Sequence, residues 1–224
     1  MSDIVVSKKD EVHIIVKPND SGIIMELSEF FTFYVPGYKF VPSYRNKLWD
    51  GKIRLYNTRD YTLPSGLFYH LQKFIKDRGY TIDAKVKKTE RELGSGYCNS
   101  IPLHCAGSKI ILRDYQQSAI EHAIKYQRAL LLSPTGSGKS LMIYMILRWF
   151  LDNSYKKALI VVPTTSLVEQ LWKDFGDYSH DDINFNNSEV HRIYAGKEKE
   201  YFEQRVVITT WQSIFKLPKK WFKD

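Results

Sequence analysis

The sequence has few cysteines and no long apolar run. It contains no stretch of about 18 consecutive apolar residues, and its N-terminal residues lack the continuous apolar core of a signal peptide. We therefore predict no membrane span and a cytoplasmic location. The only cysteines are Cys98 and Cys105, and with His104 they would give a metal ion three ligands instead of four. This scarcity excludes a disulfide scaffold and favours free thiols in a reducing compartment.

Apolar and basic residues are well represented. The 224 residues, of which 43% are apolar, are enough for one large or two modest globular domains. Lysine and arginine number 33 against 25 aspartate and glutamate residues, which gives a net charge of +8. This excess indicates a polyanionic partner without identifying it. The sequence shows no internal repeat and no low-complexity segment.

The most informative stretch is residues 128–141, RALLLSPTGSGKSL. An apolar run at 129–132 leads into a turn with two glycines, and helical apolar spacing follows at 139–151. This order predicts a strand, a phosphate-binding loop (P-loop) and a helix, because glycines let several backbone amides face one anion at a helix N-terminus. Lys139 would contact the β- and γ-phosphates of ATP, and the Ser140 hydroxyl would bind Mg²⁺.

This interpretation has one departure from the strict motif and one alternative. The strict motif has glycine where this chain has Ser133. The alternative is an ordinary glycine-rich turn followed by a solvated lysine. The residues of this stretch predicted to bind the nucleotide are Pro134, Thr135, Gly136, Ser137, Gly138, Lys139 and Ser140. Lys139 is the candidate catalytic residue, and Ser140 is the candidate metal ligand.

The N-terminal part of the chain is predicted to mix strands and helices. The predicted elements are a strand at 11–17, a helix at 21–33, a helix at 65–78 and a strand at 80–85. Asp20 or Ser21 would cap the first helix, and Gly79 would end the second. Residues 44–56 predict a β-hairpin, with Asp50 and Gly51 as its two-residue turn.

Residues 36–60 hold six basic and two acidic residues, a net charge of +4 that is half of the total for the chain. Three aromatic residues, Tyr44, Trp49 and Tyr56, are interleaved with these cations. The combination predicts a surface that contacts nucleic-acid phosphates. The candidate contacts are Arg45, Lys47, Lys52 and Arg54. The alternative is a solvated hairpin face with its aromatics packed inside, and for Trp49 we favour a core position over base stacking.

The C-terminal half alternates strands and helices, as a parallel sheet with crossover helices requires. Predicted strands lie at 129–132, 158–162, 190–194 and 205–209, and predicted helices at 110–124, 139–151 and 166–175. The unbroken apolar run at 158–162 predicts a strand buried on both faces. The chain is thus predicted to consist of a small basic α+β domain at 1–86, a polar linker at 87–108 and an α/β domain at 109–224.

Four stretches of the C-terminal half resemble, in their order, the motifs of one enzyme family. They are LRDYQ at 112–116, SPTGSGKS at 133–140, VPTTSLVEQ at 162–170 and ITTWQS at 208–213. They resemble the glutamine motif and motifs I, Ia and Ic of superfamily 2 helicases. In addition, WDGKIRL at 49–55, TWQS at 210–213 and KLPKKWF at 216–222 are similar to the UvsW-type recombination and repair helicases of T-even phages. The likeness covers nearly the whole chain.

The resemblance implies a RecA-like first helicase lobe that binds ATP and Mg²⁺ and acts on branched DNA. Gln116 would contact the adenine edge and Arg113 would stack on the base, whereas the alternative for Gln116 is an ordinary exposed helix position. Phosphates of one DNA strand would contact two strand ends. The residues implied there are Pro163, Thr164, Thr165, Thr209, Thr210 and Trp211. Thr165 or Ser166 would also be a helix N-cap, and Trp211 is equally consistent with packing.

The resemblance also implies parts that this sequence does not contain. An Asp-Glu pair that binds Mg²⁺ and orients the attacking water does not occur downstream of the P-loop, and the second RecA-like lobe with its arginine finger is absent. We therefore expect a fragment or a shortened product that hydrolyses little ATP alone, located in the host cytoplasm if a phage encodes it. Two other functions stay open, namely a non-catalytic DNA-binding module and the translocase subunit of a restriction enzyme.

Overall fold

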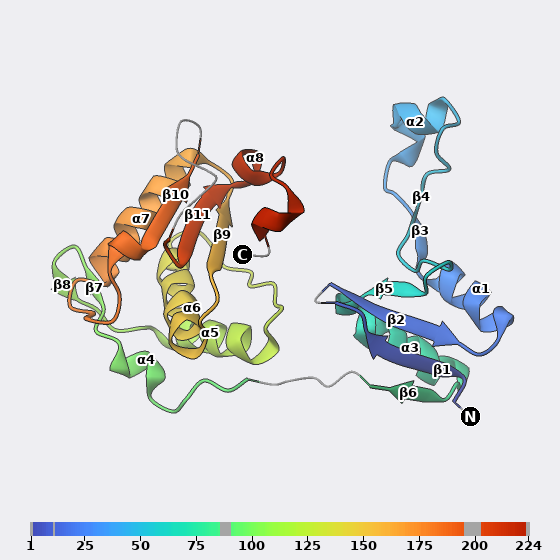
Figure 1. Cartoon of the computed structure of the whole chain (residues 1–224), viewed down its shortest axis with the longest axis horizontal. Coiled ribbons are helices and arrows are strands. Elements are labelled where there is room, and N and C mark those ends of the chain that lie inside the picture. Colours follow the sequence, from blue (N-terminus) through green and yellow to red (C-terminus); the bar gives the residue numbers. More distant parts are fainter. Residues whose placement is uncertain (1, 11, 86–90, 195–202, 223–224) are drawn as a thin grey trace. The chain divides into compact units, whose positions relative to one another are not determined.

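The computed structural model describes residues 2–10, 12–85, 91–194 and 203–222. The chain divides into two compact units, Met1–Thr89 and Glu90–Asp224, and each has its own hydrophobic core (Figure 1). Among the described residues, no helix is both long enough and apolar enough to cross a membrane.

The first unit is built on a four-stranded sheet with the order β5-β2-β1-β6. Its strands are β1 (Ile4–Lys8), β2 (His13–Pro18), β5 (Thr62–Pro64) and β6 (Ile82–Ala84). Strand β1 pairs antiparallel with β2 and parallel with β6. Ile4 and Val6 of β1 are fully buried, whereas Val5 between them is 38% exposed. This alternation shows that one face of the sheet carries the core and the other is partly open to solvent.

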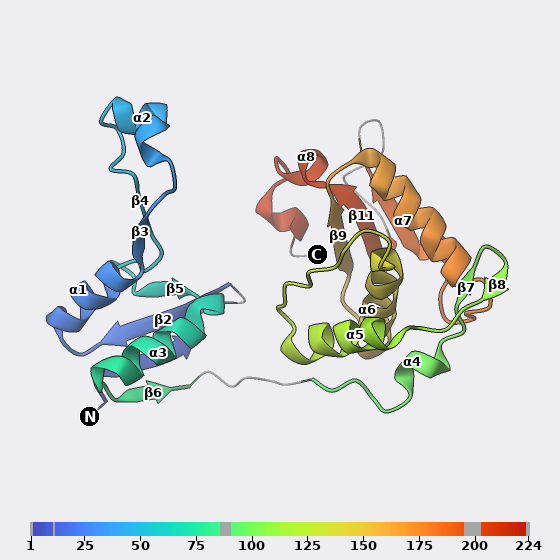
Figure 2. The same cartoon turned by 180° about the vertical axis from the view of Figure 1, so that it is seen from behind.

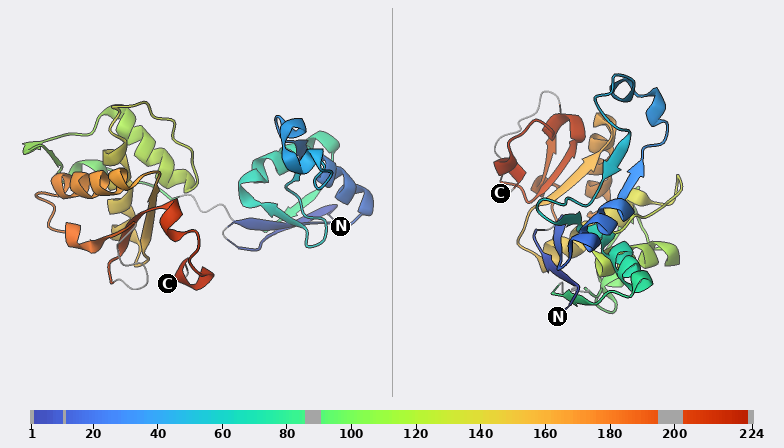
Figure 3. Two further views of the ribbon diagram at one scale, coloured as in Figure 1. Left: turned by 90° about the horizontal axis from the view of Figure 1, so that it is seen from above. Right: turned by 90° about the vertical axis from the view of Figure 1, so that its right-hand side faces the viewer.

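Helices α1 (Ser21–Phe30) and α3 (Phe68–Arg78) cover the buried face of this sheet (Figures 2 and 3). Asp20 caps α1, and its carboxylate accepts a hydrogen bond from the Gly22 N–H at 2.6 Å. Helix α3 ends at Gly79, whose φ of 72° stops a helix without steric strain. Both helix predictions are confirmed, and each helix is shorter than predicted.

Residues 32–54 form a projecting arm of the first unit (Figure 1). Its base is an antiparallel ribbon of β3 (Thr32–Tyr34) and β4 (Lys52–Arg54), and its outer part contains η1 (Tyr38–Phe40) and α2 (Pro42–Arg45). The hairpin predicted at 44–56 is wrong, because β4 pairs with β3 and not with the residues just before it.

Asp50 and Gly51 do not form the predicted two-residue turn. Gly51 has a φ of 79°, but Asp50 does not occupy the left-handed region that a type I′ turn requires at both positions. A Cβ atom at Gly51 would lie 2.3 Å from Cδ2 of Tyr38. Glycine is therefore needed here because the Tyr38 ring packs directly on the backbone of the arm.

The second unit contains a three-stranded parallel sheet with the order β10-β11-β9. Its strands are β9 (Ala158–Val162), β10 (Val190–Ile193) and β11 (Val206–Thr210). Its helices are α4 (Tyr97–Ser100), α5 (Asp114–Tyr126), α6 (Lys139–Asn153), α7 (Thr165–Tyr178) and α8 (Trp211–Ile214). Val206 and Ile208 belong to the main core, whereas Val207 packs with Ile214 in a separate cluster. The prediction of a parallel sheet with flanking helices is confirmed.

In this unit one strand prediction is wrong, and another is correct in its position but wrong in its burial. Residues 129–132 pair with no strand among the described residues, and Leu130 and Leu132 are 83% and 89% exposed. Strand β9 lies at the edge of the sheet, and Leu159 and Val161 are 43% and 45% exposed. An apolar run indicates burial, but burial on both faces requires a neighbouring strand and a second layer of helices. The described residues supply neither on this side of β9.

The linker predicted at 87–108 is wrong for the part that the structure describes, since its first residues lie outside those ranges. Ile101 and Leu103 are buried in the second core at 8% and 2% exposure. Strand β7 (His104–Cys105) then pairs antiparallel with β8 (Ser108–Lys109). Ile101 and Leu103 stand on the two sides of Pro102, and two apolar residues are too few to show a periodicity. The sequence pattern therefore did not reveal that they are buried.

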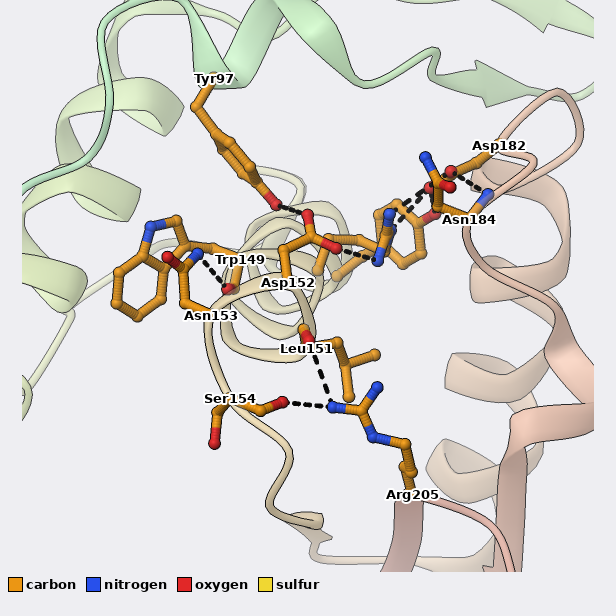
Figure 4. A network of polar contacts seen from close by, with 11 residues as sticks. Tyr97, Trp149, Leu151, Asp152, Asn153, Ser154, Asp182, Asn184 and Arg205 are labelled. Atoms are coloured by element: carbon orange, nitrogen blue, oxygen red, sulfur yellow. Dashed lines mark hydrogen bonds and ion pairs between the residues drawn. The ribbon is translucent and has the colours of Figure 1, made fainter.

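A buried charged network joins three segments of the second unit (Figure 4). Arg148 of α6 and Asp182 are 2% and 5% exposed, and their Nε and Oδ2 atoms lie 2.6 Å apart. Arg148 also donates to Oδ1 of Asp152 at 3.1 Å, and the Tyr97 hydroxyl donates to the other oxygen of this carboxylate. The Tyr144 hydroxyl donates to Asp182 at 3.1 Å. Helix α6 is thereby fixed to the residues around α4 and to the loop after α7.

Candidate nucleotide-binding and DNA-binding sites

The P-loop lies directly before α6, and its backbone is shaped to accept an anion. Gly136 and Gly138 both have a φ of 80°, a conformation that few residues other than glycine adopt. The N–H groups of Gly138, Lys139 and Ser140 donate to no carbonyl among the described residues, and they stand at the N-terminus of a helix of 15 residues. Free amides at the positive end of a helix fit a phosphate group.

An open hollow of about 810 Å³ lies beside this loop, which is a size suited to a nucleotide. The residues that line it are Arg113, Tyr115, Ser118, Ala119, His122, Leu130, Leu131, Leu132, Ser133, Pro134, Thr135, Gly136, Ser137 and Met142. Arg113 is exposed here, and its guanidinium donates to the Tyr115 hydroxyl at 3.2 Å. The hollow therefore joins the predicted base-stacking residue to the predicted phosphate-binding loop.

Lys139 is folded back onto the P-loop. Its ammonium donates to the carbonyl oxygens of Pro134 at 2.8 Å and Ser133 at 3.2 Å. Ser133, where the strict motif has glycine, also hydrogen-bonds through its hydroxyl to the Ser137 hydroxyl. In the part of the chain that the structure describes, Lys139 forms no ion pair with a carboxylate. A phosphate would displace the neutral carbonyls, since a contact between opposite charges is stronger.

Gln116 connects the start of α5 to the P-loop. Its side chain is buried, its Oε1 accepts from the Arg113 backbone N–H at 2.9 Å, and its Nε2 donates to the Ser137 carbonyl at 2.9 Å. The Tyr115 hydroxyl donates to the same carbonyl at 3.1 Å. The alternative of an exposed helix position is therefore wrong. Each end of the amide makes one hydrogen bond, which leaves one N–H of Nε2 and one lone pair of Oε1 for a further contact.

Ser140 is bonded to the neighbouring helix. Its hydroxyl lies 2.9 Å from the hydroxyl of Tyr178 on α7. Burial raises the pKa of the Asp174 carboxyl on the same helix, and the nearby Ser140 hydroxyl lowers that pKa in part. Among the described residues, no three or more His, Cys, Asp or Glu side chains group into a metal site. The arrangement suits a Mg²⁺ ion held chiefly by nucleotide phosphates, with Ser140 as one protein ligand.

The carboxyl ends of β9 and β11 bring the two predicted DNA-contacting segments of this unit together. The strands are adjacent and parallel, with Thr210 opposite Val162, so residues 163–165 and 209–211 lie at one edge of the sheet. Residues 163–165 are exposed at the N-terminus of α7, which has 14 residues, and Trp211 is 60% exposed at the start of α8. An exposed helix N-terminus beside an exposed indole suits a nucleic-acid backbone and its bases.

The threonine hydroxyls at these strand ends are used within the fold, which corrects three predictions. Thr164, and not the predicted Thr165 or Ser166, is the N-cap of α7 and accepts a hydrogen bond from a backbone N–H at 3.3 Å. Thr209 and Thr210 are 0% and 4% exposed, and their hydroxyls form hydrogen bonds of 2.9 Å inside the unit. Their side chains are therefore not available to DNA in this structure.

The four predicted DNA-contacting cations of the first unit lie on the arm in unlike environments. Arg45 and Lys47 are exposed next to the end of α2, and neither is paired with a carboxylate in the described ranges. The Lys52 ammonium lies 4.9 Å from the centre of an aromatic ring of the arm. Arg54 forms an ion pair with Asp50, and this hydrogen bond holds the pKa of the Asp50 carboxyl below its usual value. Arg45 and Lys47 are thus the cations most accessible to phosphate.

The aromatic residues of the basic window separate into core and arm. Tyr56 is 2% exposed in the core of the first unit, and burial raises the pKa of its hydroxyl. Tyr44 packs edge-on against Tyr38 in the arm, with ring centres 4.7 Å apart. Trp49 is half-buried in the arm and donates from Nε1 to the Lys52 carbonyl at 2.9 Å. The core position favoured for Trp49 is therefore wrong.

Two family matches divide the chain as the geometry does. Residues 109–223 match the family described as the type III restriction enzyme, res subunit, and the chain, with its P-loop and paired strand ends, belongs to the superfamily 2 helicases and translocases. Residues 3–85 match the family described as DNA helicase UvsW, N-terminal. Within the superfamily the chain accordingly belongs to the UvsW-type helicases, and this N-terminal match distinguishes it from restriction-enzyme subunits.

Individual relatives agree with this assignment. The chain is 34% identical over 232 residues to the ATP-dependent DNA helicase uvsW of Enterobacteria phage T4, covering 99% of this chain and 45% of that protein. It is 30% identical over 142 residues to the DNA 3'-5' translocase XPB2 of Sulfurisphaera tokodaii, covering 63% of this chain and 25% of that protein. The crystal structure of the bacteriophage T4 UvsW helicase has a TM-score of 0.87 at 31% identity, covering 99% of this chain and 79% of that one. This chain thus spans less than half the length of the two curated relatives.

Proposed function

We propose that this chain carries the DNA-docking part and the nucleotide-binding part of an ATP-dependent helicase or translocase that acts on branched DNA in recombination and repair. The observation that supports this most directly is a P-loop with free amides at the start of α6 in the same chain as an arm with accessible cations. In this proposal residues 1–86 dock on DNA and residues 109–224 belong to the motor, located in the host cytoplasm.

The proposed nucleotide chemistry begins with release of internal contacts. ATP with Mg²⁺ supplies, when bound, the phosphoanhydride bond whose hydrolysis drives the motor. Lys139 exchanges the carbonyls of Ser133 and Pro134 for the β- and γ-phosphates. Ser140, whose hydroxyl now contacts Tyr178, would be one protein ligand of the metal ion. Each exchange replaces a neutral partner with a charged one and is therefore favourable.

The same loop offers a route from the nucleotide to α5. Gln116 and Tyr115 both donate to the Ser137 carbonyl, so a shift of the loop on phosphate binding changes two contacts at the start of that helix. At the carboxyl ends of β9 and β11, the backbone N–H groups of Thr164 and Thr165 would hold one DNA strand, and Trp211 would contact its bases. A motor that moves along DNA by binding and releasing one strand in turn requires such linked changes between its nucleotide site and its DNA site.

A non-catalytic DNA-binding module is the second candidate function. It is supported by the Gln116 amide, which is buried and already hydrogen-bonded inside the protein at both Oε1 and Nε2. Such a module would bind DNA through the same arm, but adenosine nucleotides would bind weakly or leave its DNA affinity unchanged. Titrating DNA in the presence and absence of ATP separates the two candidates.

We expect the arm to account for much of the salt dependence of DNA binding. Replacing Arg45 and Lys47 by alanine should flatten the slope of log affinity against log salt by about 0.9 for each lost phosphate contact. Arg54→Ala should change it less, because Asp50 already neutralises that guanidinium. The measurement is a fluorescence anisotropy titration of a duplex at several salt concentrations.

The matched control removes two cations from the same unit but away from the arm. Lys73 and Lys76 are exposed on α3, and their replacement by alanine lowers the net charge equally. An unchanged slope for the Arg45 and Lys47 variant would remove the arm from the DNA interface. An equal change in both variants would show that total charge, and not the arm, determines binding.

A further inference from the structure

The arm contains an open hollow that the proposed motor function does not use. It has a volume of about 540 Å³ and is formed by η1, α2 and the residues just before β4. Six of the side chains that line it are Lys39, Tyr44, Arg45, Lys47, Leu48 and Trp49. Ligand sites in proteins typically measure about 300–1,000 Å³, so this hollow has room for one nucleotide.

The charge of this arm hollow favours an anion. Lys39, Arg45 and Lys47 are exposed, and within the described ranges none of them is paired with a carboxylate. Asp50 is the single acidic residue among those that line the hollow, and it is bound by Arg54. Three accessible cations around one neutralised carboxylate form a site that attracts a phosphate group.

The other side chains of the arm hollow suit a nucleobase. The bond from Trp49 Nε1 to the Lys52 carbonyl, 2.9 Å long, holds the indole in one orientation. Leu48, which also lines the hollow, is 81% exposed. Base stacking on aromatic side chains is a major contribution to binding of single-stranded nucleic acid. A base inside a continuous duplex is covered on both faces by its neighbours, so only an unpaired base can stack here.

The backbone of the arm holds Lys47 in a conformation that glycine would adopt more easily. Lys47 has a φ of 57°, and it is one of four non-glycine residues with positive φ in the described ranges. Its N–H donates to the Tyr44 carbonyl, and the next N–H, of Leu48, donates to the Ser43 carbonyl, both at 2.9 Å. This pattern ends α2 with a Schellman motif, whose left-handed position normally holds glycine or asparagine. A lysine at a strained position beside a cationic hollow points to a function for its side chain.

We propose that the arm hollow binds one unpaired nucleotide at a DNA branch, with the base on Trp49 and the phosphate among Lys39, Arg45 and Lys47. The proposal rests on the DNA-binding function proposed above and adds a basis for choosing branched DNA over continuous duplex. A tight column of rings supports the hollow, because Tyr38 stacks on one neighbour and packs edge-on against Tyr44, each at 4.7 Å. The site is therefore preformed, and binding does not need to order it.

The test compares a forked DNA with unpaired ends, a continuous duplex of the same length and a single-stranded oligonucleotide, each labelled and titrated with the whole 224-residue chain. We expect Trp49→Leu to weaken binding of the fork and the single strand by about 5–50-fold, as loss of one stacked base does, and to change duplex binding less than about twofold. The matched control is Tyr69→Leu, an aromatic residue that is 71% exposed on α3 of the same unit.

A second variant keeps the test decisive if Trp49→Leu disturbs the arm. Lys47→Gly removes one cation of the hollow and relieves the left-handed strain, so it should raise Tm by about 2–4 °C. The same variant should weaken binding of the fork several-fold. Improved stability together with weaker binding excludes unfolding of the arm as the cause of the loss.

Equal losses on fork and duplex would reduce the hollow to a general backbone contact and overturn this proposal, while leaving the proposed DNA-binding function intact. Losses with Tyr69→Leu that match those of Trp49→Leu would overturn it as well. Failure of the unmodified chain to bind any of the three DNAs would instead overturn the proposed function itself.

Discussion

Replacing Asp182 by alanine is expected to lower the free energy of unfolding of the second unit by about 3–5 kcal/mol. The side chains of Asp182 and Arg148 are each 3% exposed, so the alanine variant leaves a guanidinium buried without its main partner. The Tyr144 hydroxyl also loses its acceptor inside the core. Equilibrium unfolding in urea, followed by circular dichroism, measures the change.

Two further variants show whether the buried charge is the cause. Asp152→Ala removes the second carboxylate that contacts Arg148, but this side chain is 37% exposed, so the expected loss is about 1 kcal/mol or less. Replacing Arg148 by methionine and Asp182 by leucine together should restore most of the stability, since no unpaired charge remains. A loss below about 1 kcal/mol for Asp182→Ala would contradict the account, because it would mean that water already solvates the pair.

The parallel sheet of the second unit could be predicted because its strands have a local signal in the sequence, namely short stretches of apolar residues. Strands β9 and β11 are short apolar runs, and a predicted helix separates β9 from β10, so parallel pairing of neighbouring strands was the expected arrangement. Residues 129–132 are also apolar but pair with no strand that the structure describes, because hydrogen bonding in a sheet depends on a neighbouring strand that local sequence cannot specify. The hairpin predicted at 44–56 is wrong for a similar reason. A glycine after an aspartate locally indicates a tight turn, whereas Gly51 is needed because the ring of Tyr38, 13 residues earlier, packs on its backbone.

The candidate sites could be predicted in their positions more than in their contacts. The P-loop glycines and the start of α6 lie where the pattern placed them, since left-handed glycines and a helix N-terminus are local features. Gln116 was expected to face a base, but its amide is used between two backbone groups. Lys39 and Tyr178 were missed. Lys39 is a single lysine in an irregular segment, and Tyr178 meets Ser140 only after two helices pack.

Replacing Gly138 by alanine is expected to weaken ATP binding by about 100-fold. A Cβ atom there would lie 2.4 Å from Nε2 of Gln116, and the φ of 80° is itself unfavourable for alanine. The left-handed backbone accounts for about tenfold of the loss, since it costs about 1–2 kcal/mol. Displacement of Gln116 from its buried hydrogen bonds to Arg113 and Ser137 accounts for about another tenfold. Calorimetric titration with ATP and Mg²⁺ measures the affinity.

Gly136 provides the matched control, because it has the same φ of 80° but no atom within 4 Å of an added Cβ. Gly136→Ala should therefore show only the backbone part of the loss, about tenfold. Gln116→Ala should reproduce the other part, and its combination with Gly138→Ala should be no weaker than Gly138→Ala alone, since both remove the same contacts. Equal losses for the two glycine variants would show that the Gln116 amide does not hold the loop for ATP, and binding would then depend on the backbone of the P-loop alone.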